Sequence, residues 1–103
     1  MYKLSFFVPE SHVEATKKAV FESGAGKMGD YDSCAWQTRG QGQFRPLPGS
    51  SPHIGQHGHV EYVAEYKVEM VCSEETIQAA IAALKLAHPY EEPAYEVYRL
   101  EPL

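Results

Sequence analysis

The sequence has few cysteines, no basic cluster and no long apolar run. Two cysteines among 103 residues are too few for the disulfide framework of a small secreted domain. Nine basic and fourteen acidic residues give a formal charge of −5, and no segment concentrates Lys and Arg, so we expect no nucleic-acid partner. No apolar stretch approaches the roughly 20 residues that span a bilayer, so we expect no membrane partner.

The opening run from Met1 to Val8 is too short for the apolar region of a signal peptide, and Pro9 ends it. We interpret this run as a first strand and expect a cytoplasmic protein. Cys34 and Cys72 are then expected to be reduced and buried in the core. A buried thiol without a positive neighbour is inert, so neither cysteine is a candidate nucleophile.

Hydrophobic periodicity predicts six elements within one domain, residues 1–103. After the first strand, Ser11 and Glu14 have the spacing of a capping box, and Gly24 supplies the left-handed stop of the first helix. A second strand is predicted at about 32–40. A Gly/Pro-rich loop at 41–58 follows, and it is long enough to indicate either an interaction arm or a covered connector.

The third strand is the clearest element, because two faces alternate along it. The expected core face consists of Val60, Tyr62, Ala64, Tyr66, Val68, Met70 and Cys72. Ser73 is expected to cap a second helix with one apolar stripe, formed by Ile77, Ala80, Ile81, Leu84 and Ala87. A last strand is predicted at 94–100.

The order β-α-β-β-α-β predicts an α+β, ferredoxin-like two-layer sandwich, a four-stranded antiparallel sheet with both helices on one face. The other sheet face carries Phe7, Ala35, Val63 and Val71 among its charges. Mixed faces of this kind often bury against a second copy, so we expect a homo-oligomer, with a trimer favoured over a dimer.

Four motifs run through the chain in order. They are Gly24-x-Gly26-x-x-Gly29-x-Tyr31, Gly40-x-Gly42-x-Phe44-x-Pro46, Gly49-Ser50-x-Pro52-x-Ile54-Gly55 and His88-Pro89-Tyr90-Glu91-Glu92-Pro93-x-Tyr95. Together they resemble the Nif-three-like dinuclear-metal family and, more narrowly, the domain inserted in its longer bacterial members. The last motif is also similar to the trimeric CutA divalent-ion-tolerance proteins. Both resemblances imply a PII-like, ferredoxin-like fold.

The resemblance also limits the function that can be expected. In the family, the two-metal site is held by His, Asp and Glu of flanking domains, which lie outside this sequence. No nucleophile with an adjacent base is evident, so we expect no catalytic residues. We therefore predict a homo-oligomeric binding or regulatory module for an unknown small ligand or protein partner. The alternative is a metal-linked hydrolase of the GTP-cyclohydrolase-like type, acting alone or with a separate two-metal partner.

The glycines Gly24, Gly26 and Gly29 superficially match a dinucleotide fingerprint. However, they follow a predicted helix and precede a predicted strand. This is the reverse of the strand-turn-helix context that places a pyrophosphate at a helix N-terminus. We therefore predict a structural turn.

His88 with Glu91 or Glu92 could ligate a divalent metal if other ligands converged. A structural role is favoured, in which Tyr90 packs and a partly cationic His88 completes the negative end of the second helix. We accordingly expect no cofactor, with a weakly bound divalent metal as the alternative.

The histidines of the long loop also have a spacing that could chelate an ion, and they are His53, His57 and His59. Because a closed site needs about four ligands, incidental surface histidines are the favoured interpretation. Trp36, together with Tyr31, Phe44 and Tyr62, could line a pocket near the same loop. We favour core packing for these aromatic side chains.

Overall fold

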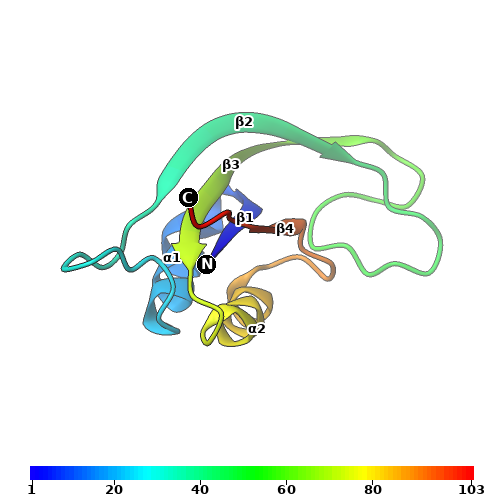
Figure 1. Ribbon diagram of the computed structural model, residues 1–103. Helices are drawn as coiled ribbons and strands as arrows, with labels where there is room; N and C mark the ends of the chain where they lie inside the picture. The colour runs from blue at the N-terminus through cyan, green and yellow to red at the C-terminus, as the bar shows by residue number, and fades with distance from the viewer.

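The computed structural model describes residues 1–103 and contains the predicted order of elements (Figure 1). A short 3-10 turn, η1, is added between the first strand and the first helix. The elements are β1 (Tyr2–Pro9), η1 (Glu10–His12), α1 (Val13–Glu22), β2 (Trp36–Phe44), β3 (Glu61–Cys72), α2 (Ile77–Ala87) and β4 (Tyr95–Arg99).

The four strands form one antiparallel sheet in the order β2-β3-β1-β4. Both helices lie below the sheet in the view of Figure 1 and leave its other face uncovered. The register pairs Leu4 with Met70 and Phe6 with Val68, so alternate residues of the two central strands face the helices together. The predicted ferredoxin-like fold class is confirmed.

The core lies between the central strands and the helices, where an apolar strand face and two apolar helix stripes meet. The apolar stripe predicted for α2 is confirmed by the burial of Ile77, Ala80 and Leu84. The core cluster consists of Leu4, Phe6, Val8, Val13, Val20, Ala25, Val68, Met70, Cys72, Ile77, Ala80 and Leu84.

Beyond this core, β2 and β3 continue as a projection that we call the distal arm, comprising residues 40–44, the connection 45–60 and residues 61–65. Figure 1 shows it at the right-hand end of β2 and β3. A strand of 12 residues extends about 40 Å, whereas helices of 10 and 11 residues extend only about 16 Å. The helices therefore cannot cover the whole length of β3.

This difference in length corrects the predicted core face of the third strand. Val60, Tyr62 and Ala64, expected in the core, are exposed, and Tyr62 is 62% accessible. The second strand begins and ends about four residues later than predicted, at Trp36 and Phe44. The long connection consequently spans 45–60 instead of 41–58. Glycines at 40 and 42 suggested a loop, but an open edge strand tolerates them.

The ends of α1 differ from the prediction at one side and agree at the other. Ser11 does not cap the helix, because its Oγ bonds to His12 Nδ1 at 2.8 Å and η1 precedes the helix. At the C-terminal end Gly24 has φ +109° and donates its N–H to the carbonyl of Phe21, as the left-handed stop requires. The prediction that Ser73 caps the second helix is wrong: Thr76 is the N-cap of α2, and the Ser73 hydroxyl donates to Thr76 Oγ1 at 3.0 Å in the turn before it.

The segment after α1 is a structural turn, as predicted from its glycines. Gly26 donates to Val71 O at 2.8 Å and accepts from Cys34 N at 2.8 Å, which fixes the turn against β3. A Cβ at Gly26 would lie 2.8 Å from the Phe21 ring, so only glycine fits there. At the tip, Met28 and Tyr31 form an isolated bridge around Gly29.

The cysteines differ in burial. Cys72 is buried, as predicted, and burial raises the pKa of its thiol. Cys34 is only half-buried, because β2 begins after it and the turn holds it at the margin of the sheet. The prediction of two core cysteines is therefore wrong for Cys34.

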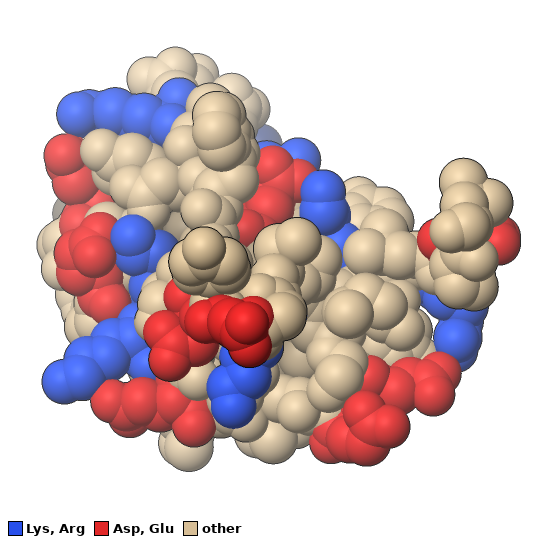
Figure 2. Space-filling model, turned by 60° about the vertical axis from the view of Figure 1, so that its left-hand side comes forward, with Lys and Arg blue, Asp and Glu red and all other residues tan.

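Acidic and basic side chains are interspersed over the face seen in Figure 2, without a patch of one sign. On the open sheet face, Glu69 lies 3.9 Å from both Lys3 and Lys67. Among the helices of the structure, neither is long and apolar enough to cross a membrane.

Candidate functional site

The connector between α2 and β4 is anchored by His88. This residue ends α2, where it adopts an extended conformation before Pro89 and donates its backbone N–H to Leu84 O. Its ring is buried. Nε2 lies 2.6 Å from Phe7 O, and Nδ1 lies 3.1 Å from the backbone nitrogen of Tyr90. Because the carbonyl only accepts and the backbone N–H only donates, this geometry assigns the ring proton to Nε2.

The imidazole of His88 is neutral rather than partly cationic. Burial lowers its pKa below the ordinary value of 6.5, and the bond to Phe7 O opposes this shift without cancelling it. The nearby His12 and His53 add a smaller lowering. The predicted attraction between a cationic ring and the helix dipole is therefore wrong. His88 does complete the end of α2, but through neutral hydrogen bonds.

The proposed metal ligands of the connector are placed differently from one another. Both ring nitrogens of His88 are engaged, so binding a metal would break one of its hydrogen bonds. Glu91 is exposed and accepts the backbone N–H of Ser51 at 3.1 Å, while Glu92 is exposed. The residues present therefore do not fit a divalent-metal site at His88. No group of three His, Cys, Asp or Glu side chains in the chain is arranged to hold an ion.

The loop histidines are not brought together either. His53 packs its ring edge-on against His12 at a centroid distance of 5.7 Å. His57 donates from Nε2 to Ser50 O at 2.8 Å, and His59 is exposed. The structure instead places His53 and His88 beside the ring of Tyr90, while His12 contacts His53.

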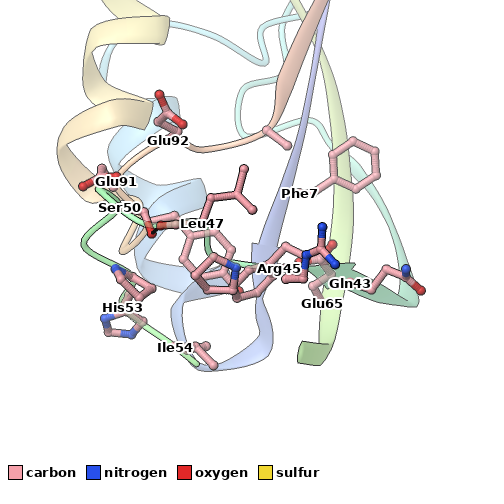
Figure 3. A pocket seen from close by; sticks show the side chains of 15 residues that line it. Phe7, Gln43, Arg45, Leu47, Ser50, His53, Ile54, Glu65, Glu91 and Glu92 are labelled. Atoms are coloured by element: carbon pink, nitrogen blue, oxygen red, sulfur yellow. Dashed lines mark hydrogen bonds between the residues drawn. The ribbon is translucent and has the colours of Figure 1, made fainter. Parts of the chain in front are cut away.

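A cavity of about 400 Å³ lies where the distal arm meets the core and the connector (Figure 3). The strand ends, the loop and the connector each contribute to its wall. Its lining consists of Phe7, Gln43, Phe44, Arg45, Pro46, Leu47, Ser50, Pro52, His53, Ile54, Glu65, Tyr90, Glu91, Glu92 and Ala94. Three of the four sequence motifs therefore converge on one cavity.

Burial raises the pKa of two groups in this wall, Tyr90 and Glu65. The hydroxyl of Tyr90 is buried and makes no hydrogen bond. Burial raises its pKa, and the charge of Glu65 raises it further. Burial also raises the pKa of Glu65, with no cation or hydrogen-bond donor opposing the shift. A buried hydroxyl without a partner is uncommon, and Glu65 is a half-buried carboxylate without an ion pair or hydrogen bond to offset its desolvation.

The position of Glu65 depends on a glycine of the neighbouring strand. The Glu65 carboxylate packs against the backbone of Gly42, and a Cβ at that position would collide with it. Gly40, two residues earlier on β2, has open space in the same direction. Gly42, a residue of the second sequence motif, thus leaves the space through which the Glu65 side chain reaches the cavity.

The aromatic residues are distributed differently from the core packing that we favoured. Trp36 is 70% exposed and Tyr31 is 75% exposed, and Tyr62 projects from the arm. Phe44 alone of the four contributes to the cavity, where its ring lies 5.7 Å from the ring of Tyr90. The alternative of an aromatic pocket near the loop therefore holds for Phe44, with partners other than those predicted.

The prolines of the motifs stiffen this wall. Pro46 is buried beneath the loop, and Pro89 and Pro93 are half-buried on either side of Tyr90.

Sequence reasoning missed Glu65, because it is one of several glutamates that alternate along β3 and nothing local distinguishes it. In the register of the two strands Glu65 pairs with Gly40 and Gly42 pairs with Val63, so the Glu65 carboxylate reaches Gly42 diagonally, an arrangement that the sequence did not fix.

Comparisons with known proteins agree with the fold. The periplasmic divalent cation tolerance protein CutA from Archaeoglobus fulgidus superposes with a TM-score of 0.69 at 16% identity, over 98% of this chain and 85% of that protein. CutA1 from Pyrococcus horikoshii gives 0.71 at 15% identity, over 100% and 86%. At this level of identity the likeness shows the fold alone, and the class is the PII-like, CutA-like ferredoxin fold.

Closer relatives match in sequence. A GTP cyclohydrolase 1 type 2 homolog of Mycobacterium leprae is 47% identical over 100 residues, which are 97% of this chain and 26% of the relative. The protein of that description from Bacillus subtilis is 40% identical over 99 residues, again 26% of its length. A Bacillus cereus protein related to NIF3 gives a TM-score of 0.83 at 37% identity, over 97% of this chain and 25% of that protein. No family model matches.

The chain is therefore a homologue of one segment of the Nif-three-like proteins, as its motifs predicted. It spans about a quarter of the length of the curated relatives it matches.

Proposed function

We propose that this chain is a ligand-binding, regulatory module that works as a homo-oligomer. The cavity at the base of the distal arm carries this proposal. Its volume of about 400 Å³ lies within the range of small-molecule sites, and aromatic and apolar walls surround a few polar groups. Among those polar groups the half-buried carboxylate of Glu65 has no ion pair or hydrogen bond inside the chain, and a ligand would supply one.

Binding is tested with a library of small fragments and the 103-residue chain labelled for nuclear magnetic resonance. We expect a subset of fragments to shift the backbone amides of Phe44 and Tyr90. Leu47 points into the cavity in Figure 3, so Leu47→Trp is expected to weaken these shifts. Leu86→Trp, at a residue of α2 that is 90% exposed, serves as the control. A library that leaves the cavity amides unmoved would contradict the binding role.

The assembly proposal is supported by surfaces that one chain leaves open. β2 is an edge strand of nine residues, and the arm exposes Tyr62 and Val60. Unprotected edges and exposed apolar side chains favour pairing with another chain. We favour a trimer over a dimer, as the resemblance to the CutA proteins implies, with the connection 45–60 close to the subunit boundary.

Light scattering at micromolar concentration tests the assembly. We expect three times the mass of one chain, dissociation by Tyr62→Glu, and no change with Leu86→Glu, which places the same charge far from the arm. A monomeric mass for the unmodified chain would remove this part of the proposal.

A second candidate is a metal-linked hydrolase activity, which the description of the relatives as GTP cyclohydrolase homologs favours. The chain would then act by docking onto the remaining three quarters of such a protein. Turnover of GTP is measured for the chain, for that remainder, and for their mixture with a divalent metal. Turnover that requires both parts would support this candidate, whereas equal turnover with and without the chain would exclude a catalytic contribution.

A further inference from the structure

The charges of the cavity define a ligand more narrowly than its volume does. Its lining contains three carboxylates, Glu65, Glu91 and Glu92, against one guanidinium, Arg45. Glu91 is already bonded to the backbone of Ser51. Glu65 is the partly buried carboxylate that no donor satisfies, so it is the group with most to gain from a cationic partner.

The surroundings of Glu65 favour an organic cation over a metal ion. A hard divalent ion requires several oxygen ligands, and no group of three ligating side chains converges here. The walls nearby are aromatic, with Phe7, Phe44 and Tyr90 in the lining. Aromatic faces bind both flat apolar bodies and the cations that they carry. The ring of Phe7 already accepts such a contact on one side, where Lys67 Nζ lies 5.9 Å from its centroid.

We propose that this cavity binds a small organic cation, an amine or amidine carried on a flat apolar body, with its N–H groups donating to the Glu65 carboxylate and its body against the aromatic rings of the lining. This inference rests on the proposed binding function and specifies its ligand. Gly42 is a positioning residue, because its missing side chain holds open the place of the Glu65 carboxylate.

The test compares three probes of nearly equal shape and different charge: benzamidine, benzamide and benzoate. Dissociation constants are measured at pH 8 by resonance shifts of the complete chain. A charge-assisted bond to a carboxylate predicts that benzamidine binds at least about tenfold more tightly than neutral benzamide, and that benzoate binds more weakly still.

Matched variants locate the preference. Glu65→Gln keeps the shape of the side chain and is expected to abolish the tenfold difference, while Glu69→Gln, four residues along the same face of β3, preserves it. Gly42→Ala is expected to reduce the difference by displacing Glu65, and Gly40→Ala to leave it unchanged. Circular dichroism spectra establish that each variant is folded.

The outcomes separate this inference from the binding function. Equal binding of benzamidine and benzamide, or a preference that survives Glu65→Gln, overturns the organic-cation class. Tighter binding of benzoate, or displacement of benzamidine by zinc alone, overturns it as well. If library fragments without a positive charge shift the cavity amides while benzamidine does not, the cavity remains a binding site and the inference falls. Cavity amides that no compound shifts remove both.

Discussion

The core and the distal arm share one strand, β3, yet they bury its side chains differently. On one face of β3, Val68 and Met70 are almost completely buried, whereas Tyr62 and Ala64 on that same face are exposed. The alternation of side chains continues along the whole of β3. Only its covering by the helices changes, because the helices end before the strand does. A strand pattern thus specifies which side chains share a face, while the neighbouring elements decide whether that face is core.

The position of the cavity follows from this comparison. It lies at the boundary, where the sheet leaves the helices and the connection 45–60 returns over it. β1 supplies one wall through Phe7, and the arm supplies the other through Phe44. Sites built at such a boundary combine a rigid support with a wall that can adapt, as binding loops on rigid scaffolds commonly do.

The largest expected effect tests the core side of the comparison. Leu84→Ala removes a completely buried side chain of α2 and is expected to lower the free energy of unfolding by about 3 kcal/mol. Leu86→Ala, two residues along the same helix and exposed, is expected to change it by less than about 0.5 kcal/mol. Urea titration measures both. Similar losses for the two variants would mean that the helix packs through a different face.

The next effect concerns Tyr90, which joins the connector to the arm. Tyr90→Ala is expected to cost about 2 kcal/mol, because it removes ring contacts with Phe44 and His88 from a half-buried site. Tyr90→Phe removes only the unpartnered hydroxyl, so it is expected to leave stability unchanged or to raise it slightly. A loss above about 1 kcal/mol for the phenylalanine variant would reveal a hydrogen bond to that hydroxyl.

A pH dependence is expected from His88, whose pKa is lowered in the folded state. As pH falls below 6.5, the unfolded chain takes up a proton that the folded chain still excludes, so stability decreases towards the folded pKa and is fully retained above 6.5. The neighbouring His12 and His53 contribute to the lowered pKa of His88, and Tyr90 stays neutral over this range because burial raises its pKa.

Thermal melts between pH 5 and 8 of the unmodified chain and of His88→Gln separate these contributions. The glutamine variant cannot titrate at this position, and it is expected to have a flatter profile below pH 6.5. His59→Gln, at an exposed loop position, is the control and should follow the unmodified chain. Identical profiles for the unmodified chain and His88→Gln would rule out His88 as the origin.

The sequence predicted the core far better than it predicted the arm. Alternation and helical spacing determine which side chains share a face, so the order of elements, the stripe of α2 and the turn at Gly24 could be derived. The burial of Tyr62 could not be derived, because it depends on the relative lengths of strand and helix. Likewise Glu65 could not be distinguished from Glu69, because the contact of its carboxylate with Gly42 depends on strand register and side-chain direction.

The motifs identified the cavity wall without revealing its chemistry. Tyr90, Phe44 and Pro46 were singled out through resemblance, and the structure places all three in one lining. The metal role considered for His88 followed from the residue type, and only the two hydrogen bonds of its ring show that its nitrogens are occupied. The local sequence specifies that a histidine stands at position 88, whereas one hydrogen-bond partner of its ring is the carbonyl of Phe7, which is distant in the sequence.

The smallest expected effect is that of added metal, on either side of the comparison. On the core side, His88 would have to surrender a hydrogen bond to Phe7 O or to the Tyr90 N–H. In the arm, the ring of His53 packs against His12, and His57 is bonded to Ser50 O. We therefore expect calorimetric titration of the tag-free chain with zinc, manganese and copper to show no site of micromolar affinity. A site of one ion per chain that disappears in His88→Ala, with the fold retained, would overturn this expectation, whereas loss in His53→Ala alone would assign the ion to the arm.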